Sequence, residues 1–136
     1  MSDADVLVLS TLEDIRYSIV LIMRRFETIH HYDDFLVDEV GLEKLDSISM
    51  RLVAIGEGFK HIDKLTDKQL LTRYPEINWK GVKGVRDILT HHYFDLDAET
   101  IFMICQDKLN ELLRVTDAMI VETKSKLNHQ KGVMDE

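Results

Sequence analysis

The sequence predicts an all-α protein, an antiparallel helical bundle of about five helices. Two long segments carry apolar residues three and four positions apart, which is the spacing of a helix that buries one face. The chain has only one proline and six glycines among its 136 residues, so few positions interrupt a helix. No segment shows a useful length of the apolar and polar alternation that is typical of a half-buried strand.

The first predicted helix ends near Ile29. Two capping-box spacings compete for its start, Ser2–Asp5 and Ser10–Glu13, and we favour the earlier one. The stripe that predicts this helix consists of Leu12, Ile15, Ile19, Ile22, Phe26 and Ile29.

A second long helix is predicted from about Leu42 to about Ile62, after a turn at residues 30–34. In that turn, Asp33 or Asp34 is placed to cap a short helical piece that reaches Val37. Two stripes of similar length suggest an antiparallel hairpin. The second stripe consists of Leu45, Ile48, Leu52, Ile55, Phe59 and Ile62.

The remaining helices are placed by capping residues and by the single proline. Thr66–Gln69 has the capping-box spacing, and Pro75 ends the short helix that follows. Asp97 is the expected N-cap of a last long helix that reaches about Leu127. We therefore expect one domain over residues 1–127 and a flexible tail over 128–136. The last stripe consists of Phe102, Cys105, Leu109, Leu112 and Met119.

Composition excludes several classes of protein. A net charge of −8 argues against a protein that coats nucleic acid. The one cysteine, Cys105, allows neither an intramolecular disulfide nor a zinc site built on paired cysteines, and we interpret it as a core residue. No run of 18 apolar residues exists and the N-terminus is acidic, so we expect a cytoplasmic protein with no membrane contact. We expect neither a metal nor another cofactor.

Residues 79–93 differ from the rest of the chain in charge. They hold Lys80, Lys83 and Arg86 against one acid, Asp87, which amounts to +2 with histidine neutral. Because the whole chain carries −8, the other residues carry −10. A positive island in an acidic chain can attract a phosphate ester to one place, so Lys80 and Lys83 are candidate RNA-binding residues.

Arg86 and His91 are the two residue types that phosphodiester cleavage without a metal requires. Such cleavage needs a proton carrier with a pKa near neutrality and a cation that stabilises the charge of the transition state. Tyr93 lies seven positions after Arg86 and would share its face if one helix ran through both. His91 would be displaced by about 140° on a regular helix, a gap that a helix ending near His91 or a second chain would reduce.

The stretch Tyr74–Trp79 and the motif Arg86-x4-His91-x-Tyr93 together resemble the HepT-like branch of the HEPN superfamily. Gly84, two positions before the arginine, adds to the resemblance. Two earlier stretches, Tyr32–Phe35 and Ile55–Lys60, are also similar to that family, so the likeness spans about residues 6–127. One departure is His92, which gives adjacent histidines in the motif.

The resemblance implies a homodimeric helical bundle in which two motif copies face each other across a basic cleft. It implies a bacterial endoribonuclease toxin that acts without metal. His91 would be general base or acid at a ribose 2′-hydroxyl, Arg86 would stabilise the phosphate, and Asp87 would orient the pair. It further implies a cognate antitoxin, an MntA-like nucleotidyltransferase, that transfers AMP to Tyr93. AMP would fill the cleft and neutralise its cation.

Simpler interpretations stand beside these. Arg86 with His91 could be a helix-end ion pair, and Tyr93 a half-buried aromatic residue. We interpret Trp79 as structural, and Gly56-x-Gly58 as a site of close helix approach because it lacks the preceding strand of a dinucleotide fold.

Two questions are left open by the sequence. The first is whether the basic cleft includes Arg24, Arg25 and Arg51, since these residues could equally form a solvated face of the long helices. The second concerns catalysis: the alternative function is a non-catalytic helical subunit that binds substrate for, or stabilises, a nucleotidyltransferase.

Overall fold

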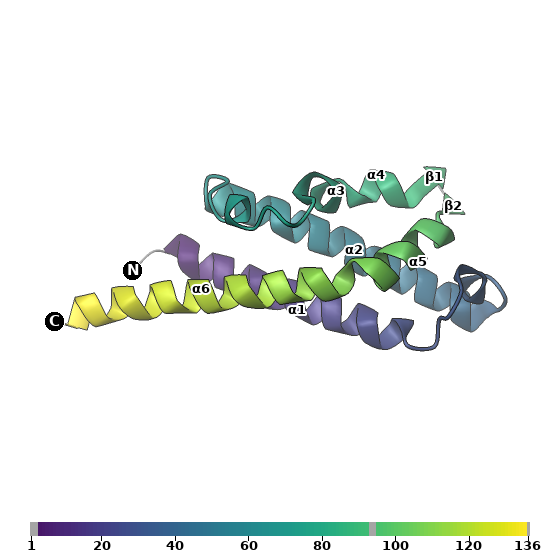
Figure 1. Ribbon diagram of the computed structural model, residues 1–136, viewed down its shortest axis with the longest axis horizontal. Helices are drawn as coiled ribbons and strands as arrows, with labels where there is room; N and C mark the ends of the chain where they lie inside the picture. Colours follow the sequence, from purple (N-terminus) through teal and green to yellow (C-terminus); the bar gives the residue numbers. More distant parts are fainter. Residues whose placement is uncertain (1–2, 93–94, 136) are drawn as a thin grey trace.

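The computed structural model describes residues 3–92 and 95–135, and the side chains within 3–90 and 95–130 (Figure 1). Over these residues the chain is an all-α bundle with six α-helices, two short 3-10 helices and a small two-stranded ribbon. The elements are α1 (Asp3–Phe26), η1 (Tyr32–Phe35), α2 (Glu39–Leu65), η2 (Leu71–Arg73), α3 (Trp79–Lys83), α4 (Val85–Leu89), β1 (Thr90–His92), β2 (Asp95–Leu96), α5 (Ala98–Asp107) and α6 (Leu109–Asp135).

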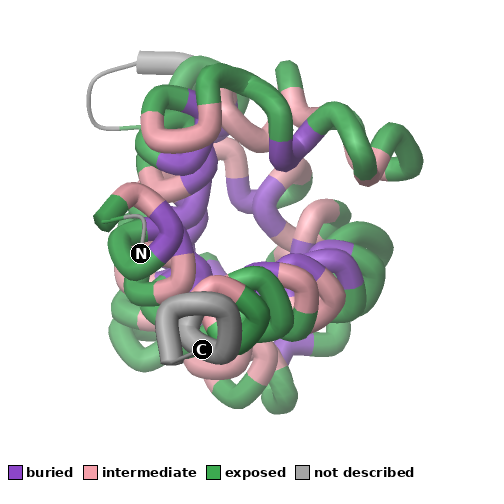
Figure 2. Tube along the Cα trace, turned by 90° about the vertical axis from the view of Figure 1, so that its left-hand side faces the viewer, coloured by how far each residue is buried: buried purple, intermediate pink, exposed green. Residues whose placement is uncertain are grey.

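Three long helices, α1, α2 and α6, run along the long axis of the molecule (Figure 1). α1 packs against both α2 and α6, and the colours show that it runs antiparallel to each. Buried residues face the space between the helices, and exposed residues lie on the outside (Figure 2). The short helices α3 and α4 lie along α2, on the side away from α1.

The apolar stripes predicted from the sequence form the core. Every predicted stripe residue of α2 is buried, and so are those of α1 and its extension, except Phe26, which is half-buried. In the last stripe Phe102 is half-buried and the other four residues are buried. Each fully buried aliphatic side chain contributes roughly 1.5–3 kcal/mol to folding. The predicted hairpin and its early start at Asp3 are therefore confirmed.

One expected cap is found, and two differ: the short helix η2 has Leu70 at its N-cap position, with no side-chain cap, rather than Thr66. Asp97 caps α5 by accepting a hydrogen bond from the Thr100 backbone N–H at 3.0 Å. The cap of η1 is His31 rather than Asp33 or Asp34. The Asp34 carboxylate instead accepts hydrogen bonds from the backbone N–H groups of His30 and His31, at 2.8 and 3.1 Å, and these bonds lower its pKa.

The structure has more elements than the five helices we expected. The predicted last helix is divided at Lys108 into α5 and α6, and the segment around Gly84 forms two short helices. β1 and β2 pair antiparallel, with Thr90 opposite Leu96. These strands have three and two residues, so they are too short to show an alternating pattern in the sequence. α6 continues to Asp135, beyond the expected end at Leu127. No described helix is long and apolar enough to cross a membrane.

Gly56 allows α3 and α4 to lie directly on α2. A Cβ atom at this position would be 2.6 Å from the carbonyl oxygen of Val82 and 3.1 Å from Cγ1 of Val85. Gly58 serves the other side of α2 in the same way, because a Cβ there would be 2.9 Å from the side chain of Ile15. Close helix approach, as expected from the sequence, explains both glycines.

Replacing Gly56 by alanine should lower the free energy of unfolding by about 1–3 kcal/mol, the usual cost of overpacking. The backbone of Val82 would have to move away from α2, and α4 would move with it. Urea unfolding followed by circular dichroism measures the change. Ala54→Ser, on the exposed side of the same helix, is the control and should change stability by less than about 0.5 kcal/mol. Equal stability of Gly56→Ala and the native protein would contradict the close contact.

Candidate active site

The motif segment is anchored to α2 by Trp79 at the start of α3. The Trp79 ring packs against Phe59 with ring centroids 4.8 Å apart, and its Nε1 donates to the Tyr74 carbonyl oxygen at 2.9 Å. Asn78 caps α3 by accepting from the Gly81 N–H at 3.2 Å. Trp79 is thus structural, as predicted, and it fixes the point from which α3 and α4 start.

Arg86 lies on the outer side of α4, and its side chain is 68% exposed. Its Nη2 atom is 4.0 Å from Oε1 of Glu57 on α2. Glu57 also pairs with Lys60 at 3.5 Å, so its charge is shared between two cations. An exposed pair at this distance contributes at most about 1 kcal/mol. The guanidinium is therefore oriented by Glu57 and open to solvent.

Glu57 is a site neighbour that the sequence analysis missed. It belongs to the stretch Ile55–Lys60, where the resemblance to a known family was noted, but nothing marked this glutamate as a partner of Arg86. An exposed helical glutamate has the same pattern whether it faces water or a distant arginine. Only the packing of α4 on α2 brings the two together.

α4 ends at Leu89, and Thr90 adopts an extended conformation with φ −119° and ψ 130°. The helix that carries Arg86 therefore ends at Leu89, before it reaches position 93. The backbone of His91 lies in β1, directly after this helix end. The side chain of His91 and the whole of Tyr93 fall outside the part of the chain that the structure describes.

Of the other candidate residues of the motif, two are exposed to solvent and one is bonded to α2. Lys80 and Asp87 are exposed and make no ion pair with another described residue. Lys83 instead points back to α2, where its Nζ is 2.5 Å from Oδ2 of Asp63. The exposed fractions of these two side chains are 30% and 10%. Lys83 thus holds α3 on α2, a role that sequence reasoning did not assign to it.

Comparison with known proteins identifies the family. Residues 15–119, which include the whole motif segment, match the family described as Ribonuclease HepT-like. The chain belongs to the HepT-like ribonuclease family. The match begins within α1 and ends within α6, so all three long helices contribute to it.

Similar proteins occur in Methanocaldococcus jannaschii. The HepT-like chain is 29% identical to the protein named "Putative RNase MJ0127" over 89 residues, which are 65% of this chain and 68% of that protein. It is 31% identical over 75 residues to "Putative RNase MJ0125" and to "Putative RNase MJ1216". These two matches cover 55% of this chain, and only 61% and 59% of the relatives. No solved structure matches the chain significantly.

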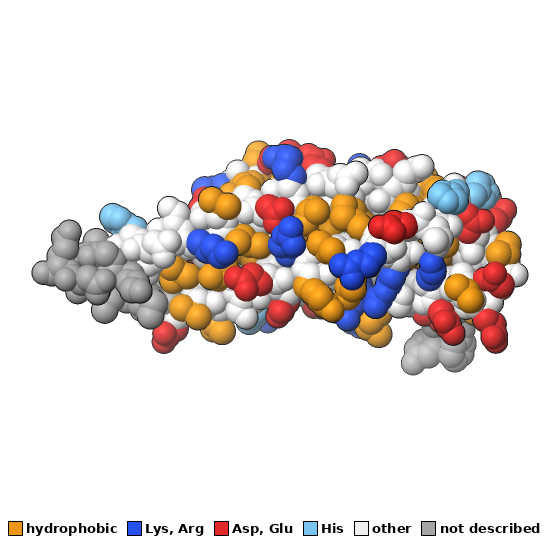
Figure 3. All heavy atoms as spheres, turned by 90° about the horizontal axis from the view of Figure 1, so that it is seen from below, with side chains coloured by type: hydrophobic (Ala, Val, Ile, Leu, Met, Phe, Trp, Pro, Cys, Tyr) orange, Lys and Arg blue, Asp and Glu red, His pale blue; other side chains and the backbone are white. Residues whose placement is uncertain are grey.

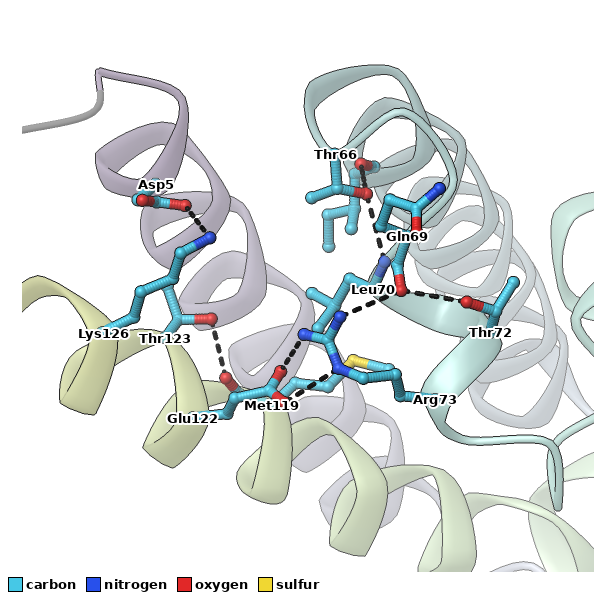
Figure 4. A network of polar contacts seen from close by, with 11 residues as sticks. Asp5, Thr66, Gln69, Leu70, Thr72, Arg73, Met119, Glu122, Thr123 and Lys126 are labelled. Carbon is cyan, nitrogen blue, oxygen red and sulfur yellow. Dashed lines mark hydrogen bonds and ion pairs between the residues drawn. The ribbon is translucent and has the colours of Figure 1, made fainter.

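Two hollows in the described part of this HepT-like chain lie away from Arg86. One is an apolar groove of about 360 Å³, lined by Val82, Val85 and Ile88 together with residues of α2, α5 and α6. The other, of about 510 Å³, has several charged residues in its lining and lies where the start of α1, the end of α2 and α6 meet (Figure 4). Neither is lined by Arg86, Asp87 or Lys80, so the exposed motif residues lie on open surface.

Two basic residues that line this second hollow, Arg73 and Lys126, are already in ion pairs. Arg73 pairs with Glu122 at 2.8 Å, and the hydrogen bond from this guanidinium to the carboxylate raises the pKa of Arg73 (Figure 4). Lys126 lies 3.3 Å from the carboxylate of Asp5. These pairs join α6 to η2 and to α1. This hollow therefore has a structural role, at the place where α6 is joined to its neighbours.

Neither a metal nor a thiol offers an alternative chemistry within the described residues. No group of three His, Cys, Asp or Glu residues there could hold a metal ion. Burial raises the pKa of the Cys105 thiol to about 12, so the thiol is protonated at neutral pH and is a poor nucleophile. Cys105 is buried in the core, as predicted.

Replacing Lys83 by methionine should lower the free energy of unfolding by about 1–3 kcal/mol, because the carboxylate of Asp63 would lose its partner while nearly buried. The double variant Lys83→Met with Asp63→Leu should recover most of this loss, since no unpaired charge then remains. Thermal unfolding at neutral pH measures both. A single variant as stable as the native protein would show that Lys83 is not a structural anchor.

Proposed function

We propose that this chain is a metal-independent endoribonuclease, the toxin of a toxin–antitoxin pair, with Arg86 and His91 as its catalytic residues. Its membership of the HepT-like ribonuclease family carries the proposal. Two features of the site support it: Arg86 is exposed on α4, and His91 follows within three residues of the helix end at Leu89.

The reaction is transfer of a phosphodiester to the neighbouring ribose 2′-oxygen. His91 accepts the proton of the 2′-hydroxyl, and the 2′-oxygen attacks phosphorus. The bond from phosphorus to the 5′-oxygen breaks, leaving a 2′,3′-cyclic phosphate and a 5′-hydroxyl. The leaving oxygen takes its proton from a protonated imidazole, which a homodimer supplies from its second motif. Atoms and charge balance without a metal ion.

Arg86 stabilises the negative charge that develops on the phosphate. A guanidinium binds a phosphate through two parallel hydrogen bonds, which are stronger than a loose exposed pair with one carboxylate. The phosphate therefore replaces Glu57 as the partner of Arg86. Asp87, the next residue on α4, supports the orientation of the catalytic pair, and Lys80 adds positive charge on the approach to it.

The active form is a homodimer in which two copies of the motif share one cleft. A cognate MntA-like nucleotidyltransferase neutralises the toxin by transferring AMP to Tyr93. The added nucleotide places a negative charge two residues after His91, where it competes with RNA for Arg86.

Cleavage of a structured RNA by the purified protein in EDTA tests the proposed chemistry. Replacing His91 by alanine should lower the cleavage rate about 10²- to 10⁴-fold, the usual contribution of a general acid–base residue. Arg86→Ala should lower it about 10²- to 10³-fold.

Matched controls come from α6: Arg114→Ala and His129→Ala remove an exposed arginine and an exposed histidine that lie outside the motif. Both should cleave at the native rate. If protein free of AMP leaves RNA intact, the chain is a non-catalytic subunit. If the two motif variants cleave normally, the assignment of the site is wrong.

The proposed regulation predicts a mass change. When the chain is coexpressed with the nucleotidyltransferase encoded beside it, its intact mass should increase by one or more AMP units. Tyr93→Phe should abolish that increase, because phenylalanine has no hydroxyl to accept AMP. Tyr32→Phe is the control and should keep the increase. Modification that persists in Tyr93→Phe would place the acceptor elsewhere.

A further inference from the structure

Four basic residues of α1 and α2 have no acidic partner among the described residues, and two of them, Arg51 and Lys44, bond across the seam between these helices. These are Arg24 and Arg25 in the last turn of α1, and Lys44 and Arg51 on α2. Within the described part of the chain, none of the four makes an ion pair. Lysine and arginine side chains gather towards the end of the bundle away from the C-terminus on the face seen from below (Figure 3).

Most of the other arginines, and several lysines, contrast with these four. Acids neutralise Arg16, Arg73, Lys83, Arg114 and Lys126, each at 3.3 Å or less. The seam therefore concentrates unpaired positive charge in a chain whose net charge is −8. Unpaired cations in one row attract a polyanion, and acidic surroundings limit the attraction to that row.

Tyr17 and Arg51 form an aromatic platform at one end of this row. The guanidinium carbon of Arg51 lies 5.8 Å from the centre of the Tyr17 ring, and Nη1 of Arg51 donates to the Ser18 hydroxyl at 3.3 Å. The guanidinium is thus held over one face of the ring. Tyr17 is still 60% exposed, and Met50, the residue before Arg51 on α2, is 69% exposed.

The other end of the row is held by Lys44, whose Nζ donates to the Thr28 hydroxyl. Lys44 and Arg51 are seven residues apart, about 10 Å along α2. Arg51 contacts Ser18, and Lys44 contacts Thr28. In the sequence, Arg24 and Arg25 lie between Ser18 and Thr28. The cations therefore form a short track that begins at the ring of Tyr17.

We propose that this seam is a binding site for single-stranded RNA, in which a base stacks on Tyr17 beside Arg51 and phosphates lie along Arg24, Arg25 and Lys44. Aromatic rings that stack bases, beside cations that bind phosphates, are the parts of a single-strand site.

The seam is close enough to Arg86 to hold the same RNA strand, and this part of the inference rests on the proposed function. Arg51 precedes Glu57 by six residues, about 9 Å along α2, and Glu57 contacts Arg86. A strand that lies along Arg24, Arg25 and Lys44 would pass Tyr17, cross the exposed side of α2 and have its scissile phosphate at Arg86. The seam would position RNA and take no part in bond breaking.

Fluorescence anisotropy with a labelled single-stranded RNA tests the seam separately from cleavage. All variants are made in the His91→Ala background, so that binding is read whether or not the native chain cleaves RNA. Tyr17→Ala should weaken binding at least about fivefold, and Tyr17→Phe should bind as the parent does. The double variant Arg24→Ala with Arg51→Ala should also reduce the slope of log K against log salt by about 1.4.

The control is Lys108→Ala with Lys124→Ala, which removes two exposed cations of α5–α6 that lack an ion pair among the described residues. It should leave the affinity within about twofold. An equal loss of RNA affinity in the two double variants would overturn the proposed site, because the change in net charge alone would then explain the loss. A change of dimer mass in Tyr17→Ala, measured by light scattering, would overturn it too, since the seam would then be where two copies meet.

The test remains decisive in two further cases. If Tyr17→Ala fails to fold, as its melting curve would show, the Arg24 and Arg51 double variant carries the test. If the native chain does not cleave RNA but the seam variants still lose RNA affinity, the proposed function fails and the RNA site stands. If the native chain cleaves RNA and no seam variant changes RNA binding, the proposed RNA site is wrong and the proposed function stands.

Discussion

The close approach of α3 and α4 to α2 at Gly56 determines where Arg86 lies. With no side chain at Gly56, the backbone of Val82 rests against α2, and a Cβ atom would stand 2.6 Å from its carbonyl oxygen. Trp79 on Phe59 and Lys83 on Asp63 fix the same unit to the same helix. Because α4 has only five residues, it has little stability of its own, and these contacts hold the arginine in place.

The long helices could be predicted from the sequence because their signal is repeated. Each stripe contains five or six apolar residues at helical spacing, and one misplaced residue does not hide the pattern. The ribbon of β1 and β2 could not be found in this way, since two or three residues have no period. The cap of η1 was also missed: His31 is an unusual capping residue, while Asp33 and Asp34 are typical ones.

The candidate site was predictable in its chemistry and not in its contacts. A guanidinium, an imidazole and a tyrosine at fixed spacing are visible in one short segment. The acidic partners are not visible, because Glu57, which pairs with Arg86, and Asp63, which pairs with Lys83, lie on another helix, and their contacts depend on how α3 and α4 pack. Lys83 illustrates the difference: its charge suggested an RNA contact, and its side chain is bonded to Asp63. Sequence spacing ranks residue types, whereas packing decides which charges are already paired.

The same distinction applies to the charge of the whole chain. A total of −8 argues against a protein that coats nucleic acid, yet a total counts paired and unpaired charges alike. Several cations of this chain are neutralised one by one by acids of neighbouring helices, and such pairs present little field to a ligand. The cations that remain open to an incoming phosphate include Lys80 and Arg86 near one side of α2, and those of the seam with α1 on the other. Excess acid elsewhere then disfavours every other place of contact, so a negative total is compatible with a local site for RNA.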